Sequence, residues 1–141
     1  MKYIKFFLIP AILFIGCESQ KDGQSSDEIA GTYVMEKTYE VRHEATGEPV
    51  GMATLRDTII ITRISDGYEV KNRKWKKNEF DEEGWVKQEH DATPDYKAKF
   101  EESLQSLSSE PAGLFSPLKI VAEKNLLIKG KKEVEYKKSH H

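Results

Sequence analysis

The chain has 141 residues, with 22 basic and 24 acidic side chains and a single cysteine. That length supports one domain of ordinary size. It excludes a large α/β barrel, an enzyme with a separate cofactor domain and a protein with several membrane spans. The near-neutral charge provides no basic face for nucleic acid, so we expect no nucleic-acid partner.

Residues 1–16 have the pattern of an export signal. Lys2 and Lys5 precede an almost wholly apolar run over residues 6–16, about half the roughly 20 residues that a membrane-spanning helix needs. The sequence Phe14-Ile15-Gly16-Cys17 resembles the lipobox of bacterial lipoproteins. In that family the chain is cleaved before the cysteine, which then carries acyl chains. An ordinary secretory signal, or a short uncleaved anchor, is the alternative interpretation.

The resemblance implies a lipid anchor on Cys17. Two or more acyl chains give durable membrane binding, whereas one gives only marginal binding. Cleavage removes Lys2 and Lys5 and leaves 20 basic against 24 acidic residues, a formal charge of −4. Charge therefore does not draw the mature protein to an anionic bilayer, and the lipid must hold it there. With the only thiol acylated, no disulfide, cysteine nucleophile or cysteine-based zinc site remains. We expect the protein in the cell envelope, at the outer membrane of a Gram-negative bacterium.

Residues 17–28 are expected to be a flexible tether, because residues 18–26 include no apolar side chain. A β-rich domain over residues 29–138 follows, and residues 139–141 form a tail. Alternation of apolar and polar side chains predicts a strand from Tyr33 to Arg42 that opens toward solvent midway, at Lys37. Residues 55–64 are a second expected strand.

Ser65-Asp66-Gly67 predicts a tight turn with two candidate registers. A two-residue loop at Asp66-Gly67 pairs Ile64 with Glu69. A three-residue loop with left-handed Gly67 pairs Ile64 with Tyr68 and groups their apolar neighbours on one face. We expect the second register.

Residues 75–80 and 85–90 are expected to pair as strands around an acidic turn. Thr93-Pro94-Asp95 is typical of a helix start, and the apolar residues that follow have helical spacing: Tyr96, Phe100, Leu104 and Leu107. Three short strands, residues 118–122, 126–129 and 133–137, complete the domain. The expected fold is mainly β: a small antiparallel barrel or sandwich of about seven strands with one amphipathic helix.

Two short motifs resemble those of lipocalins. Gly31-Thr32-Tyr33 resembles their Gly-x-Trp opening, and Tyr136-Lys137 resembles their closing strand. The order of elements over residues 29–138 is similar to that of small lipocalin-like domains found on bacterial lipoproteins. The resemblance implies a small barrel and, as one candidate function, carriage of a small apolar ligand.

The remaining motifs favour no enzyme, cofactor or metal. Glu89-His90-Asp91 is the only local cluster of metal-ligating residue types, and strand neighbours point to opposite faces, so we interpret it as a solvated strand end. His140 and His141 are assigned no function. Ser116-Pro117-Leu118-Lys119 matches the Ser-x-x-Lys pattern of penicillin-recognising enzymes, but that chemistry needs a helix, and here a loop entering a strand is expected.

Trp75, Phe80 and Trp85 flank one acidic hairpin. We favour packing inside the domain, and the alternative is a partner surface, since large aromatic side chains are preferred binding anchors. The basic run over residues 73–77 is interpreted as protection of an edge strand.

These patterns together indicate a non-enzymatic, lipid-anchored envelope lipoprotein that binds another envelope protein. The alternative function is a lipocalin-like carrier of a small apolar ligand, which would need an open cavity of roughly 300 Å³ or more.

Overall fold

The computed structural model describes residues 27–140, so the expected signal, Cys17 and residues 18–26 of the tether lie outside the described part of the chain. The described residues form nine strands: β1 (Gly31–Arg42), β2 (Pro49–Ile64), β3 (Gly67–Asn78), β4 (Trp85–Lys87), β5 (Tyr96–Glu101), β6 (Ser106–Glu110), β7 (Leu118–Val121), β8 (Leu126–Lys129) and β9 (Val134–Lys138). Two three-residue 3-10 turns, Glu102–Leu104 and Ala122–Lys124, lie between strands.

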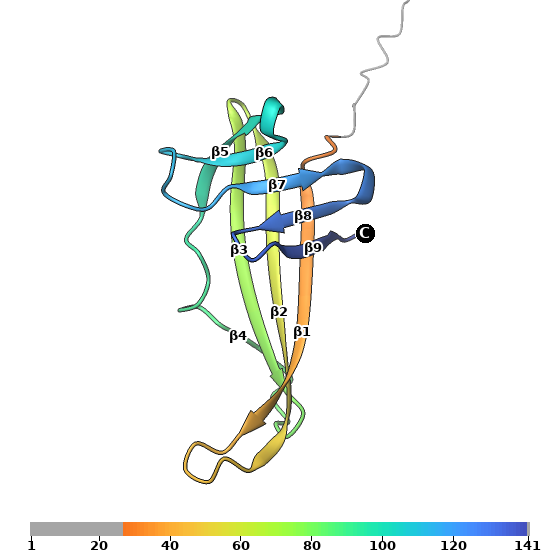
Figure 1. Cartoon of the computed structure of the whole chain (residues 1–141), viewed down its shortest axis with the longest axis vertical. Coiled ribbons are helices and arrows are strands. Elements are labelled where there is room, and N and C mark those ends of the chain that lie inside the picture. The colour runs from red at the N-terminus through yellow and green to blue at the C-terminus, as the bar shows by residue number, and fades with distance from the viewer. Residues whose placement is uncertain (1–26, 141) are drawn as a thin grey trace, which may run out of the picture.

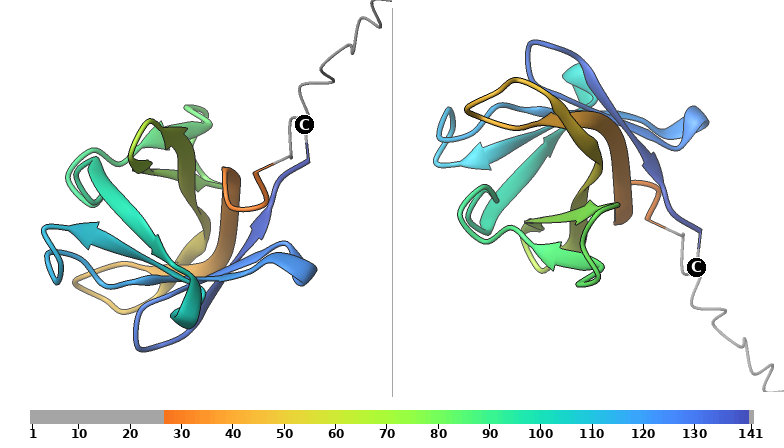
Figure 2. Two further views of the ribbon diagram at one scale, coloured as in Figure 1. Left: turned by 90° about the horizontal axis from the view of Figure 1, so that it is seen from above. Right: turned by 90° about the horizontal axis from the view of Figure 1, so that it is seen from below.

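The strands form one antiparallel sheet that closes on itself. Its order is β2-β1-β9-β8-β7-β6-β5-β3-β4, and β2 also pairs with β3, so eight strands make a ring while β4 pairs with β3 at its side. In Figure 1, β1, β2 and β3 run along the long axis of the molecule and β5 to β9 cross them. The views along that axis show the strands arranged around a common interior (Figure 2).

Alternate side chains of the eight ring strands fill this interior and form the core. The core includes Tyr33, Ile59, Leu107, Leu127 and Tyr136, each no more than 2% exposed. Strand β1 leaves the ring after Met35, since its residues are exposed from Glu36 to Glu40 and it pairs with β9 only at Tyr33 and Val34. The expectation that the first strand opens toward solvent midway is confirmed.

The mainly β, antiparallel class is confirmed, but two details were wrong. Residues 27–140 form nine strands rather than about seven, and residues 67–78 form one long strand, β3. No α-helix occurs within residues 27–140. The expected helix is instead strand β5, a 3-10 turn and strand β6. Asp95, expected as an acidic residue in the first turn of the helix, instead pairs with Arg73, and Leu104 of the expected stripe is 63% exposed. Tyr96, Ala98 and Phe100 alternate along β5, so a period of two prevails over the helical spacing.

The β2–β3 turn adopts neither expected register. Ile64 pairs with Gly67, and Ser65-Asp66 form the two-residue loop. Gly67 has a φ of +152°, and a Cβ there would lie 2.6 Å from the carbonyl oxygen of Ala98 on β5. Only glycine allows β5 to approach so closely, and this contact favours Gly67 as the first residue of the strand over a place inside the loop.

Replacement of Gly67 by alanine should therefore destabilise the ring. We expect Gly67→Ala to lower the free energy of unfolding by at least about 2 kcal/mol, because the new methyl group meets rigid backbone. Gly113→Ala is the matched control, since Gly113 also has a positive φ but a Cβ added there would meet no atom within 4 Å. It should cost about 1 kcal/mol. Equal losses in urea denaturation would show that the β5 contact is unimportant.

Asp27 fastens the start of the described chain to the ring. Its Oδ1 accepts hydrogen bonds from the amides of Ile29 (3.0 Å) and Ala30 (3.2 Å). The Tyr68 hydroxyl donates to its Oδ2 at 3.1 Å, and Arg63 donates to that hydroxyl at 2.7 Å. Burial raises the pKa of the Asp27 carboxyl, but these amides, the hydroxyl and the Arg63 charge together hold it below its ordinary value.

This lowered pKa predicts a loss of stability in acid. A carboxyl whose pKa is lower in the folded state stabilises the protein above its ordinary pKa, and the contribution disappears as pH falls through the folded value. Wild type should therefore exceed Asp27→Asn in unfolding free energy at pH 7, and the difference should shrink below about pH 4. Urea denaturation at several pH values measures it. A difference that is constant between pH 3 and pH 7 would contradict the assignment.

Candidate functional site

A groove of about 610 Å³ crosses the outer face of the sheet over five adjacent strands, from β4 through β3, β2 and β1 to β9. Its lining residues come from every one of these strands: Thr32, Val34, Glu36, Arg56, Thr58, Trp75, Trp85, Lys137, Lys138 and Ser139. The groove is therefore built by the pairing of the strands and not by a single loop.

The register explains why the two tryptophans share this face. Arg56 on β2 pairs with Trp75 on β3, and Lys77 on β3 pairs with Trp85 on β4. Directly paired residues point to the same side of a sheet, and so do residues two apart on one strand. Trp75, Lys77 and Trp85 must consequently point outward together with Arg56.

Arg56 holds the Trp85 side chain in place at the groove. Its guanidinium carbon lies 4.2 Å from the centre of the Trp85 ring, and its Nε donates to Glu36 Oε1 at 2.6 Å. The ion pair alone is partly exposed and contributes little to stability. The Arg56 guanidinium also stacks on the Trp85 side chain, however, so Arg56 links strands β1, β2 and β4. This stacking fixes the orientation of the Trp85 side chain, which is 37% exposed.

The structure brings together only two of the three aromatic residues proposed as a partner surface. Trp75 is half-buried and Trp85 is exposed, and neither belongs to the core, so the expectation that they pack inside the domain was wrong. Phe80 does not line the groove. Its ring lies over Gly51, where a Cβ would come within 3.0 Å of its Cδ1.

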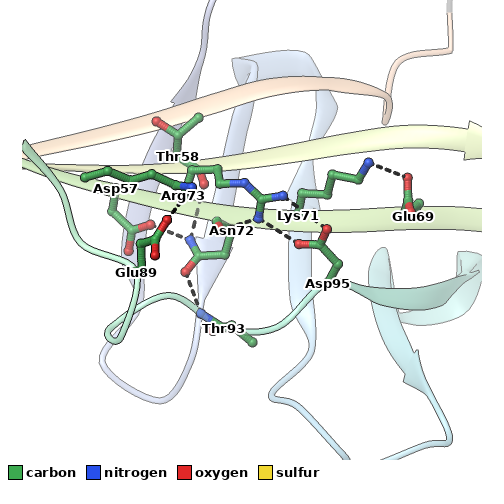
Figure 3. Close-up of polar contacts among 10 residues, drawn as sticks. Asp57, Thr58, Glu69, Lys71, Asn72, Arg73, Glu89, Thr93 and Asp95 are labelled. Carbon is green, nitrogen blue, oxygen red and sulfur yellow. Dashed lines mark hydrogen bonds and ion pairs between the residues drawn. The ribbon is translucent and has the colours of Figure 1, made fainter.

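The basic run over residues 73–77 does not protect an edge strand. It lies within β3, which pairs with β2 along its whole length and with β4 and β5 on its other side. Figure 3 shows Arg73 in a two-pronged contact with Asp95, with nitrogen–oxygen distances of 2.7 and 3.1 Å. This pair attaches the loop that precedes β5 to the outer face of β3.

A polar cluster occupies the opposite, inner face of the same strands. Asp57 is 4% exposed, and its carboxylate accepts hydrogen bonds from Asn72 Nδ2 at 2.5 Å and from the Tyr136 hydroxyl at 2.9 Å. Asn72 also donates to the Thr58 carbonyl and accepts from the Thr93 amide (Figure 3). Burial, together with the Asp57 charge, raises the pKa of the Tyr136 hydroxyl, so it remains a donor.

Sequence reasoning missed the residues that complete both faces. Arg56, Glu36 and Lys137 have no local motif, because they meet only through strand pairing. Asp57 and Asn72 did leave a signal: each is a polar residue at a buried position of an otherwise apolar alternation. Such residues are usually hydrogen-bonded to one another, which suggests a shared partner across the sheet.

The other sequence motifs lie apart from the groove. His90 is exposed in a loop, and Ser116 and Lys119 lie in a loop and on strand β7. Across residues 27–140, no group of three or more histidine, cysteine, aspartate or glutamate residues is placed to hold a metal ion. Nor is any helix in this part of the chain long and apolar enough to cross a membrane. No family model, curated protein or solved structure matches the chain.

Removal of one oxygen atom from the inner polar cluster should cause a large loss of stability. Tyr136→Phe leaves the buried Asp57 carboxylate without one of its two side-chain donors, so we expect a loss of about 1.5–3 kcal/mol in unfolding free energy. Tyr39→Phe is the matched control, because Tyr39 is 37% exposed and its hydroxyl makes no hydrogen bond within residues 27–140. Thermal and urea denaturation measure both variants. Similar small changes in the two would contradict the role given to the Tyr136 hydroxyl.

Proposed function

We propose that this protein is an exported, lipid-anchored binding module of the cell envelope, and that it holds another envelope protein in the outer groove without catalysing a reaction. The observation that carries the proposal is the presence of both tryptophans of the chain in one open groove of about 610 Å³. The lipobox-like signal ending at Cys17 supports the anchored location.

The groove has the composition of a binding centre. Tryptophan and arginine are enriched among residues that contribute most to protein–protein affinity. Arg56 stacks on Trp85 before any partner arrives, so less side-chain entropy is lost on binding. Lys137 lies at the other end of the groove and has no ion-pair partner within residues 27–140, so a probe at this position breaks no ion pair of the described chain.

The end of the ring at which the described chain begins supports presentation of this face beside a membrane. The described chain begins at one end of the ring, whereas the β1–β2 hairpin projects from the opposite end (Figure 1). A flexible segment of about ten residues has an average reach of roughly 17 Å. A chain anchored at Cys17 would therefore stand close to the bilayer with its long strands pointing away from it.

Carriage of a small apolar ligand receives less support. We propose that the ring is a small barrel. Its interior is filled by large side chains such as Tyr33, Leu107 and Tyr136. The cavity lined by Ile59, Val70 and Tyr96 has a volume of about 180 Å³, below the roughly 300 Å³ at which ordinary ligand pockets begin.

Site-specific photo-crosslinking in the native membrane tests the proposal. A photoreactive residue replaces Lys137 in the groove or, as the matched control, Lys124, an exposed lysine outside it. We expect position 137 to capture one defined protein that position 124 does not. Trp85→Ala should reduce this capture at least tenfold while the protein stays in the membrane fraction, because that variant removes an anchor of the groove only.

Cys17→Ala separates the anchor from the groove. It should release the protein from the membrane fraction, since no second lipid site is expected. Retention of the Cys17→Ala protein would contradict the lipid anchor. Capture of the same species from positions 137 and 124, or capture that is indifferent to Trp85→Ala, would contradict the groove as the binding surface.

A further inference from the structure

A lysine points into the interior of the ring. Lys129 follows the fully buried Leu127 by two residues on β8 and pairs with the buried Leu118 on β7. Both relations place its side chain on the inner face of the sheet. Lys129 is half-buried there, and its ammonium makes no hydrogen bond or ion pair within residues 27–140.

This lysine lines a partly enclosed cavity of about 180 Å³. The apolar floor consists of Ile59, Val70 and Leu118. The rings of Tyr96 and Phe115 form a wall, with centroids 4.5 Å apart and planes tilted by 36°. Three polar residues, Asn72, Thr93 and Ser116, complete the lining.

The charges around the cavity leave an excess of positive charge. Lys129 and Lys74 contribute two cations that are close enough to interact, and Asp57 contributes one anion. The Asp57 oxygens already accept from Asn72 and Tyr136. Burial and Lys74 lower the pKa of the Lys129 ammonium, whereas Asp57 opposes the shift. The half-buried Lys129 ammonium has no partner in the described chain, so an anion that enters the cavity would form a partly desolvated ion pair with it.

We propose that this cavity binds a small monocarboxylate with a compact apolar body. The carboxylate pairs with the Lys129 ammonium, and the body lies between the Tyr96–Phe115 wall and the apolar floor. The volume limits the ligand to a size below that of ordinary drug-like molecules. The site lies on the inner side of the sheet, so it is independent of a partner in the outer groove.

Benzoate is the probe, with benzamide as its neutral counterpart of equal size. Isothermal titration on the full-length protein in detergent should show saturable binding of one benzoate per chain, with benzamide at least tenfold weaker. In NMR spectra benzoate should shift the amide signals of Thr93 and Ser116. These comparisons use the wild-type protein and do not depend on any variant folding.

Lys129→Met then removes the charge and keeps much of the side-chain length. It should weaken benzoate binding at least tenfold, whereas Lys119→Met should leave it unchanged. Lys119 is the matched control because it lies on neighbouring strand β7 but is exposed. Equal binding of benzamide and benzoate, or a Lys129→Met protein that binds benzoate as wild type does, would overturn the proposal. Inorganic phosphate binding as tightly as benzoate would overturn the role given to the apolar body.

Discussion

The continuous pairing of β2 with β3 is the interaction on which both faces of the molecule depend. It joins twelve consecutive residue pairs, from Ala53–Asn78 to Ile64–Gly67. It also closes the ring, because β2 and β3 stand at the two ends of the chain of pairings through β1, β9 and their neighbours. In a closed ring each strand has two neighbours, so the buried faces reinforce one another around the interior.

The same pairing explains how the polar cluster around Asp57 is hydrogen-bonded inside the core. Asn72 pairs directly with Ile59, which lies two residues beyond Asp57 on the same face of β2. The Asn72 amide therefore reaches the Asp57 carboxylate diagonally, while Tyr136 reaches it from β9 across the interior. A buried carboxylate is tolerable only with such donors. The Tyr136 bond connects residues 79 positions apart, so it also ties the first part of the domain to its last strand.

Local alternation predicted the class of fold and several strands, including residues 126–129, but could not predict the long-range pairings. The helix prediction failed because Tyr96, Phe100, Leu104 and Leu107 satisfy helical spacing by coincidence, and only the contact with β3 selects the strand. The prediction of the turn register failed for a similar reason, because the close approach of Ala98 to Gly67 cannot be predicted without knowing that β5 lies there. Trp75 and Trp85 could be identified as candidates, whereas Arg56 could be placed beside them only through the sheet.

The register set by the β2–β3 turn determines which side chains face the outer groove and which face the interior of the ring. A shift of the β2–β3 pairing by one residue would put Asp57 opposite Arg73 or Trp75, and side chains that now share a face would point to opposite sides. Arg56 and Trp75 would no longer build one groove, and Asp57 would lose Asn72. Gly67 and the Ser65-Asp66 loop therefore position the outer groove and the inner cavity at once, although none of these residues lines either of them.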